Sequence, residues 1–294
     1  MRDEGTPARW LRKLKVIPRG LSEVGQRFLF YLTLMQVSSD LELDVIIPAA
    51  EKDLAVLPYT IDGVRRNIRH PIANISVVAP VKSNIRALCN KKGCEFVDER
   101  SLVDTDPGGI DLVVNGVSRS TWIYQQFLKW SADTIGQANH FLVVDADTVY
   151  IRPQVFERDG RIVFNYSDEY NQPYFDMYQR LLREPVRFPS SFTSHQMLYE
   201  KRILLELKRK IAEFHGCDWK EAILRHLDRG EPSGVSDYDT YGQYVFLHYP
   251  ESMAIEYWSN LSLPRHRNLT GVGWLGLKYG GKYKSVSFHS YKKA

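Results

Sequence analysis

Residues 140–147 read HFLVVDAD, a short apolar run that ends in two aspartates. A run without polar alternation is typical of a central strand that is buried on both faces of a parallel sheet. Asp145 and Asp147 stand two residues apart, so the alternation of side chains along an extended chain directs both carboxylates the same way. The stretch therefore predicts a buried strand that presents two carboxylates at its carboxyl end.

The chain before this strand alternates between short β-branched runs and helical segments. Strands that alternate with helices form parallel sheets with helices on both faces. We therefore expect an α/β fold with a parallel sheet. The predicted strands are residues 44–48, 75–79, 95–97 and 111–115, and the predicted helices are residues 53–69, 84–92 and 122–135.

The second half of the chain is richer in helical patterns. Thr193 followed by Gln196 reads as a capping box that opens a long helix ending at Gly216. Asp218 and Ser236 are expected to start two further helices. Strands are predicted at residues 161–166 and 285–288. No linker or repeat divides this part from the first, so residues 41–294 are expected to form a single domain.

The composition excludes several classes of protein. The 294 residues carry 39 Lys and Arg against 35 Asp and Glu, and this net charge of +4 is too small for a protein that binds duplex nucleic acid. The three cysteines cannot form a disulfide framework and lack zinc-ligand spacing. The longest apolar run, residues 28–35, is shorter than the roughly 20 residues of a transmembrane helix. We expect a cytoplasmic protein that binds no nucleic acid.

The two aspartates after the apolar strand form an Asp-x-Asp pair. Open α/β sheets bind ligands at the carboxyl ends of their parallel strands. Two carboxylates that converge there repel each other, and a divalent cation relieves the repulsion. The alternative is that one aspartate caps the following turn while the other is solvated. The spacing alone leaves both interpretations open.

The stretch FLVVDADTVYIRP at residues 141–153 resembles the DxD segment of glycosyltransferases with the GT-A fold. Further segments resemble a group of bacterial GT-A proteins associated with surface polysaccharides, namely WIYQQFLK at 122–129, HQML at 195–198, SDYDTYG at 236–242 and HS at 289–290. The resemblance implies a Rossmann-like, mixed and mostly parallel sheet flanked by helices, with a helix-rich acceptor half. It also implies that Mn²⁺ or Mg²⁺ bridges the DxD pair to the diphosphate of a nucleotide sugar.

The same resemblance implies roles for individual residues. Asp145, Asp147 and the late His289 would bind the metal ion. Asp237, at a predicted helix start, would be the general base that deprotonates the acceptor hydroxyl in an inverting reaction. If Asp237 is not the base, a retaining mechanism is favoured instead. Asp237 also suits a helix N-terminus electrostatically, and His289 also suits a structural role.

Other residues are expected to bind the substrates. The expected donor is a nucleotide sugar, with a UDP-sugar favoured, and the expected acceptor is a glycan or a lipid-linked glycan. Gln125 and Lys129 also fit the solvent-facing side of a helix, and the C-terminal lysines also fit a solvated tail. The expected donor-binding residues are Asp53, Arg119, Gln125, Lys129, Ala146 and Lys284, and the expected acceptor-binding residues are His195 and Tyr241.

Two further patterns separate the candidate functions. GVGWLG at residues 271–276 matches GxGxxG, but no helix is expected after it, so a loop that closes over the donor is predicted instead of a dinucleotide site. Residues 49–60 lack the glycine-rich signature of a sugar nucleotidyltransferase, which is the alternative enzyme. Intact Asp145 and Asp147 argue against a non-catalytic sugar-binding protein with a degenerate fold. The leading hypothesis is a metal-dependent glycosyltransferase.

Both ends of the chain are basic, whereas the middle is mildly acidic. Residues 1–36 carry seven basic side chains against three acidic ones, and the last twenty residues add five lysines and no acid. Residues 1–40 are therefore expected to form a basic amphipathic segment. This segment either lies on the anionic inner face of the cytoplasmic membrane or packs on the domain.

Overall fold

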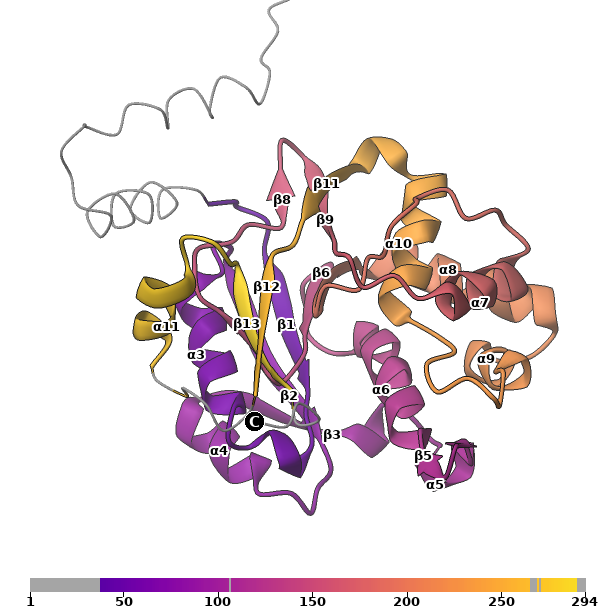
Figure 1. Ribbon diagram of the computed structural model, residues 1–294, viewed down its shortest axis with the longest axis horizontal. Helices are drawn as coiled ribbons and strands as arrows, with labels where there is room; N and C mark the ends of the chain where they lie inside the picture. The colour runs from indigo at the N-terminus through magenta and orange to yellow at the C-terminus, as the bar shows by residue number, and fades with distance from the viewer. Residues whose placement is uncertain (1–37, 106, 265–268, 270, 290–294) are drawn as a thin grey trace, which may run out of the picture.

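The fold is organised around a five-stranded sheet at the centre of the molecule (Figure 1). The computed structural model describes residues 38–105, 107–264, 269 and 271–289. The predicted basic segment 1–40 therefore lies outside the described residues, except for residues 38–40. No helix in the described part of the chain combines the length and the apolar character that crossing a membrane requires.

The central sheet has the strand order β10-β6-β1-β2-β3. The strands β6, β1, β2 and β3 run parallel, and β10 pairs antiparallel with β6. The prediction of a mixed, mostly parallel α/β sheet is confirmed, and HFLVV forms a strand with a neighbour on each side. The bounds are β1 (Leu43–Pro48), β2 (Ile72–Ala79), β3 (Glu95–Asp98), β6 (His140–Val144) and β10 (Gln196–Glu200).

Alternate residues of β6 face two separate cores. Phe141 and Val143 belong to the core under α6 (Ser120–Ser131), whereas Leu142 and Val144 belong to the core under α3 (Leu57–Asn67) and α4 (Ile85–Lys92). All four side chains are completely buried. Because helices cover both faces of the sheet, none of these four positions would let a polar side chain reach water.

Helices dominate the chain beyond β9 (Arg161–Tyr166), as the sequence predicts. Gly216, at a φ of 63°, ends α8 in the left-handed conformation that favours glycine. The side chains of Asp218 and Ser236 cap α9 and α10 by accepting hydrogen bonds from backbone N–H groups, so both predicted helix starts are confirmed. The helices are α7 (Gln172–Leu182), α8 (Lys201–His215), α9 (Trp219–His226) and α10 (Asp237–His248).

Two smaller sheets extend the central one. In the first, β9 (Arg161–Tyr166) lies between β11 (Met253–Tyr257) and β8 (Glu157–Arg158); in the second, β13 (Ser285–His289) lies between β12 (Asn260–Pro264) and β7 (Thr148–Tyr150). β7 directly follows Asp147, and the antiparallel β13 begins opposite its far end. The backbone N–H of Phe288 donates to the carbonyl of Asp147 at 2.9 Å. This pairing brings His289 to the two aspartates.

Two expectations about local structure are wrong. Residues 111–115 do not extend the central sheet, because Asn115 and Gly116 adopt left-handed φ angles of 50° and 76° and turn β4 (Val113–Val114) back onto β5 (Val117–Ser118). Thr193 and Gln196 do not open a helix. Gln196 starts β10, which completes the edge of the central sheet beside β6, and α8 begins only at Lys201.

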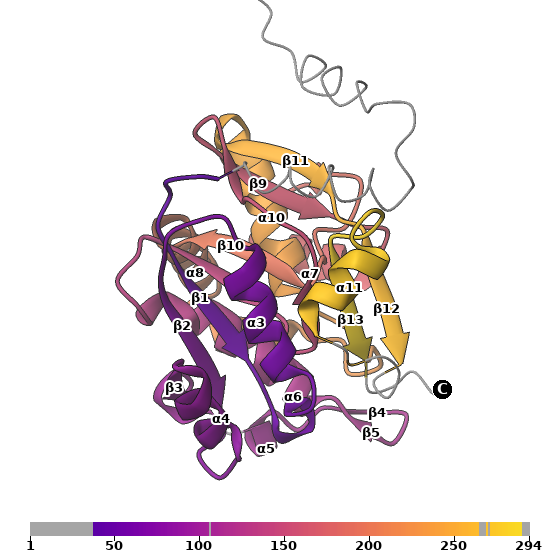
Figure 2. The same ribbon diagram turned by 90° about the vertical axis from the view of Figure 1, so that its left-hand side faces the viewer.

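A third correction concerns residues 271–276, which form most of helix α11 (Val272–Tyr279) instead of a loop. The glycines allow close packing, since a Cβ on Gly276 would lie 2.7 Å from the carbonyl oxygen of Ile151. In Figures 1 and 2, α11 lies beside α3 on the outside of the molecule. The remaining short elements are η1 (Glu51–Asp53), η2 (Glu99–Ser101), α5 (Pro107–Ile110), η3 (Ala132–Thr134) and η4 (Pro250–Ser252).

Candidate active site

A cavity of about 450 Å³ lies at the carboxyl ends of β1 and β6. This is the sheet edge at which the two aspartates predict a ligand. The fold gathers side chains there from both halves of the chain. Most of the predicted site residues line this cavity, namely Asp53, Arg119, Gln125, Lys129, Asp145, Ala146, Asp147, His195, Asp237 and His289.

Asp145 is held by partners from three different parts of the fold. Its Oδ1 lies 3.0 Å from Nζ of Lys129 and accepts from the Tyr238 hydroxyl at 2.9 Å, while its Oδ2 lies 3.4 Å from Nδ1 of His195. Burial alone would raise the pKa of Asp145, but Lys129 and His195 outweigh it and hold the pKa below its usual range. Asp145 is therefore a charged and fixed carboxylate.

Asp147 faces the end of β13. Its Oδ2 lies 3.4 Å from Nδ1 of His289. Next to this pair, the hydroxyls of Thr148 and Ser287 are hydrogen-bonded at 2.8 Å and hold β7 against β13. Neighbouring ligands of an octahedral Mg²⁺ ion are about 3 Å apart, so the carboxylate and the imidazole are spaced as two ligands of one cation.

The protein side chains alone do not complete a metal site. In residues 38–105, 107–264, 269 and 271–289, no three or more His, Cys, Asp or Glu side chains form a group that could hold a metal ion. A cation at Asp147 and His289 would therefore need further ligand oxygens. Phosphate groups and water supply such oxygens in many Mg²⁺ sites.

Lys129 is buried between two carboxylates. It is 6% exposed, and its Nζ lies 3.0 Å from Oδ1 of Asp145 and 3.5 Å from Oδ1 of Asp237. Burial alone would lower the pKa of Lys129, but the two carboxylates outweigh it and raise the pKa. The interpretation of Lys129 as part of a solvent-facing helix side is therefore wrong.

Asp237 is the first residue of α10 and is 2% exposed. Its Oδ2 accepts from the Tyr199 hydroxyl at 2.6 Å, and its backbone N–H donates to Oε1 of Gln126 at 3.0 Å. Burial raises the pKa of Asp237 to about 6, although Lys129 and Tyr199 oppose this shift. Asp237 is thus a buried carboxyl whose charge changes near neutral pH.

His195 occupies a strained backbone position at the cavity. Its φ is 65°, in the left-handed region that residues other than glycine rarely adopt. Its backbone carbonyl accepts a hydrogen bond from the N–H of Asp145 at 3.0 Å. The ring lies between two carboxylates, because its Nε2 is 3.3 Å from Oε1 of Glu169. Burial alone would lower the pKa of His195, but Asp145 and Glu169 raise it to about 10, which makes the ring cationic.

The other expected donor-binding residues that line the cavity also have structural partners. Asp53 is 4% exposed, and its Oδ2 accepts from the backbone N–H of Ala50, the residue before η1, at 2.9 Å. The guanidinium of Arg119 donates to the loop before α10. The carbonyl of Ala146 accepts from the Thr60 hydroxyl at 2.9 Å. Gln125 is half-buried on α6.

Two predicted site residues do not line the cavity. Lys284 is buried in an ion pair with Glu256, over the ring of Trp258, and burial lowers its pKa to about 8 despite the charge of Glu256. Tyr241 is 1% exposed, and its hydroxyl accepts from the backbone N–H of Glu200 at 3.0 Å. Both side chains stabilise the fold, so neither is retained as a substrate-binding residue.

Several cavity residues are absent from the predicted set. Glu169, Tyr174 and Tyr238 line the cavity, as does Trp122, whose ring lies 6.3 Å from that of Tyr174 at an interplanar angle of 18°. Glu169 follows the predicted strand at residues 161–166, so an acidic residue beyond a strand end was the available signal. No sequence pattern indicates that α6 and α7 bring the two aromatic rings together.

Comparison with solved structures finds distant likenesses to glycosyltransferases. Mouse xyloside xylosyltransferase 1 shows 13% identity and a TM-score of 0.48 over 86% of this chain and 100% of the other. The galactosyltransferase LgtC, in complex with donor and acceptor sugar analogues, shows 12% identity and a TM-score of 0.45 over 85% and 88%. Glucosyl-3-phosphoglycerate synthase from Mycobacterium tuberculosis, in complex with Mn²⁺ and UDP, shows 9% identity and a TM-score of 0.38 over 82% and 75%. These scores carry no information on the substrate of this chain.

Comparison at the level of sequence assigns the chain to a family without assigning an activity. No curated protein sequence matches it. A family of unknown function, DUF6492, matches residues 72–270, which include the central strand, the Asp-x-Asp pair and the start of α10. This match spans more than half of the chain, and the protein therefore belongs to the DUF6492 family.

Proposed function

We propose that the protein is a metal-dependent glycosyltransferase, which moves a sugar from a nucleotide-sugar donor to a glycan or a lipid-linked acceptor. The observation that carries this proposal is the meeting of Asp145, Asp147 and His289 in one cavity at the carboxyl edge of a parallel sheet. Carboxylates beside an imidazole suit a divalent cation. The cationic side chains of the same cavity suit a phosphate-containing ligand.

The side chains present fit Mn²⁺ or Mg²⁺ as the cofactor. The 3.4 Å between Asp147 Oδ2 and His289 Nδ1 suits two ligands of one ion, and Asp145 adds a carboxylate to the same cavity. The imidazole favours Mn²⁺ over Mg²⁺. Oxygens of the donor diphosphate would complete the ligand set. When bound, the cation would stabilise the negative charge on the leaving diphosphate.

The donor is proposed to lie between η1 and α6. Lys129 and Arg119 line the cavity and provide positive charge for a diphosphate, while Gln125 provides a side-chain amide for the sugar. We propose that Asp53 binds the ribose or the base, next to the backbone of Ala146. A UDP-sugar is the proposed donor, on the resemblance of the motifs alone.

The acceptor is proposed to lie toward the helices of the second half. His195, Glu169 and Tyr174 line this part of the cavity together with Trp122. Charged groups can hydrogen-bond sugar hydroxyls, and aromatic rings can pack against the apolar face of a sugar. These residue types support a carbohydrate acceptor.

The proposed reaction is a substitution at the anomeric carbon of the donor. The bond from this carbon to the diphosphate oxygen breaks, and its electron pair leaves with the nucleoside diphosphate. A new bond forms from the acceptor oxygen to the same carbon, and the hydroxyl proton passes to the carboxylate of Asp237, which lines the cavity. A pKa of about 6 leaves Asp237 mostly ionised at neutral pH, as a general base requires. This assignment gives an inverted product.

The cellular role is proposed from the sequence alone. The motif resemblance supports a part in bacterial surface polysaccharide synthesis. The basic composition of residues 1–36 supports a cytoplasmic location at the inner face of the membrane.

A donor screen tests the proposal. The full-length protein is incubated with a panel of UDP-, GDP-, CDP- and TDP-sugars, with Mn²⁺ or with EDTA, and release of nucleoside diphosphate and the melting temperature are measured. We expect at least one nucleotide to raise the melting temperature by several degrees with Mn²⁺ but not with EDTA. Asp147→Asn should abolish this metal-dependent shift.

The matched control is Asp159→Asn, which changes an exposed turn carboxylate in a left-handed conformation that asparagine tolerates. This variant should behave like the unchanged protein. If no nucleotide stabilises the protein with metal, and Asp147→Asn changes nothing, the proposal is wrong.

A further inference from the structure

Helix α11 exposes apolar side chains on its outer face. Trp274 and Leu277 are 58% and 61% exposed and are among the most exposed large apolar side chains of the described residues. On the opposite face, Val272 and Leu275 are buried against the sheet that contains β7 and β13. The inner face explains how α11 is attached to the domain. No element of the described residues covers Trp274 and Leu277 on the outer face. Exposed aromatic and aliphatic groups that lie together mark an interaction surface.

Basic side chains surround the two exposed apolar groups. Lys278 follows Leu277 on the outer face, and Lys282 is exposed in the next turn. From α3, exposed Arg66 reaches α11, because a Cβ on Gly273 would lie 3.2 Å from its guanidinium. No acidic residue follows Glu256 in the sequence. We call Arg66, Trp274, Leu277, Lys278 and Lys282 the α11 patch.

The α11 patch and the first described residues lie at the same end of the central sheet. Arg66 is near the end of α3, and three residues later the carbonyl of Arg69 accepts from the N–H of Ser39 at 3.0 Å. This is the amino end of β1, whereas the cavity lies at its carboxyl end. The order of α11, α3 and β1 can be followed in Figure 2.

The charge of the neighbouring sequence decides between two occupants of the α11 patch. Residues 1–36 contain apolar residues that could cover it, but they carry seven basic side chains against three acidic ones. Like charges would oppose the docking of this segment on a basic patch. A negatively charged surface would attract both the patch and the segment, because both are basic.

We propose that the α11 patch docks the protein on an anionic lipid bilayer. Trp274 and Leu277 enter the headgroup region, where amphipathic aromatic rings are favoured, and Arg66, Lys278 and Lys282 lie against lipid phosphates. The cavity at the opposite end of β1 then remains open to the solution. Nucleotide and glycan substrates therefore reach it while the protein is docked.

Tryptophan quenching by brominated lipid tests the insertion of Trp274. The full-length protein is mixed with vesicles of 30% phosphatidylglycerol and 70% phosphatidylcholine whose acyl chains carry bromine. We expect these vesicles to quench the tryptophan fluorescence of the unchanged protein. The Trp274→Phe variant should lose at least half of this quenching. Trp10→Phe is the matched control for the N-terminal segment. The proposal is wrong if the vesicles do not quench the fluorescence of the unchanged protein, or if Trp274→Phe retains all of the quenching.

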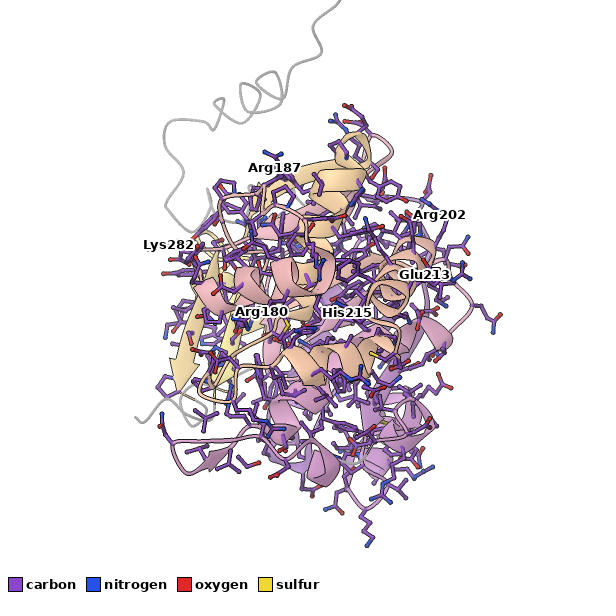
Figure 3. The ribbon with its side chains drawn as sticks, turned by 90° about the vertical axis from the view of Figure 1, so that its right-hand side faces the viewer. Arg180, Arg187, Arg202, Glu213, His215 and Lys282 are labelled. Carbon is purple, nitrogen blue, oxygen red and sulfur yellow. The ribbon has the colours of Figure 1, made fainter. Side chains whose placement is uncertain are left out.

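Charge reversal tests the basic part of the patch independently. We expect Lys278→Glu combined with Lys282→Glu to lower the partition coefficient on these vesicles by about tenfold at 100 mM salt, with an unchanged melting temperature. The control is Leu205→Ser combined with Phe214→Ser, which removes two exposed apolar groups from α8 and should leave partition unchanged. In Figure 3, Lys282 lies on the opposite side of the view from Arg202 and Glu213 of α8. Equal binding to pure phosphatidylcholine vesicles would overturn the proposal.

Discussion

The two aspartates that end the central strand are held in different ways, although they stand only two residues apart. Asp145 contacts Lys129 from α6, Tyr238 from α10 and His195 from the segment before β10. Asp147 contacts His289, which reaches it through the pairing of β7 with β13. Asp145 thus joins the two halves of the fold, whereas Asp147 contacts a histidine, a side chain that commonly binds metal ions.

This difference suggests that a single motif combines two tasks. Lys129 links Asp145 to Asp237, and Asp237 is in turn hydrogen-bonded to Tyr199, so a chain of charged and polar groups runs from the cavity into the buried core. A buried network of this kind is costly to break, because each removed group leaves a charge without a partner. The Asp147 side depends on strand pairing instead. Substitutions on the two sides should therefore have different effects.

The largest expected effect on stability follows Lys129→Met. Methionine keeps the size of the side chain but leaves Asp145 and Asp237 close together without the ammonium between them. Removing one member of a buried ion pair costs about 3–5 kcal/mol, and we expect a loss of this size in urea unfolding. Lys220→Met removes a half-buried partner of the exposed Asp218 and should cost less than about 0.5 kcal/mol. Equal losses in the two variants would show that Lys129 does not anchor the network.

The sequence predicts the central strand and its two aspartates well, because both depend on local pattern. Four consecutive apolar residues require burial on two faces, and the structure buries Phe141 to Val144 completely. The partners of Asp145 are not local. They are set by how α6, α10 and β10 meet, and the left-handed conformation of His195 is too rare in histidines to be predicted from its residue type.

The two misplaced residues show how a correct element can still mislead. Tyr241 stands one helical turn after Tyr238, but α10 is buried on most sides, so the helical period does not tell which tyrosine faces the cavity. Lys284 stands five residues before His289 on an extended chain, which places it about 17 Å away along the strand. Its pairing with Glu256 of β11 depends on how the two smaller sheets lie against each other. Tertiary neighbours, and not local propensity, decide both cases.

The next largest expected effect on stability comes from comparing substitutions of Asp145 and Asp147. Asp145→Asn should lower the free energy of unfolding by about 2 kcal/mol, because Lys129 and His195 lose a charged partner that is only partly exposed. Asp147→Asn should cost less than about 1 kcal/mol while abolishing metal-dependent activity. Urea unfolding of both variants without added metal makes the comparison. A larger loss of stability for Asp147→Asn would reverse the division of tasks.

The pH dependence of the reaction tests the role of Asp237, which Lys129 links to Asp145. Because burial raises the pKa of Asp237 to about 6, its proton stays on at pH 5 and leaves above pH 6. If Asp237 is the base, the turnover rate should fall about tenfold per pH unit below pH 6 and level off above pH 7. The effect on stability has the opposite sign. A raised pKa means that the folded state binds more protons between about pH 4 and 6, so the contribution of Asp237 to stability decreases as the pH rises through this range.

The control for this pH profile is Asp237→Asn, which removes the titrating group and keeps the shape of the side chain. The residual rate of this variant should lose the dependence on pH around 6. If the acidic limb persists unchanged in Asp237→Asn, another group titrates in this range and Asp237 is not the base.

The smallest expected effect lies at the rim of the cavity, where neither aspartate reaches. Trp122 stands seven residues before Lys129 on α6, which is about 10 Å along the helix, so the two positions are roughly two sugar units apart. Trp122→Ala should raise the KM for the acceptor by about three- to tenfold, because a partly exposed ring contributes about 1 kcal/mol of packing. The KM for the donor should stay unchanged, and Trp122→Phe should recover most of the loss. A rise in the donor KM instead would move the nucleotide, and not the acceptor, to the aromatic pair of Trp122 and Tyr174.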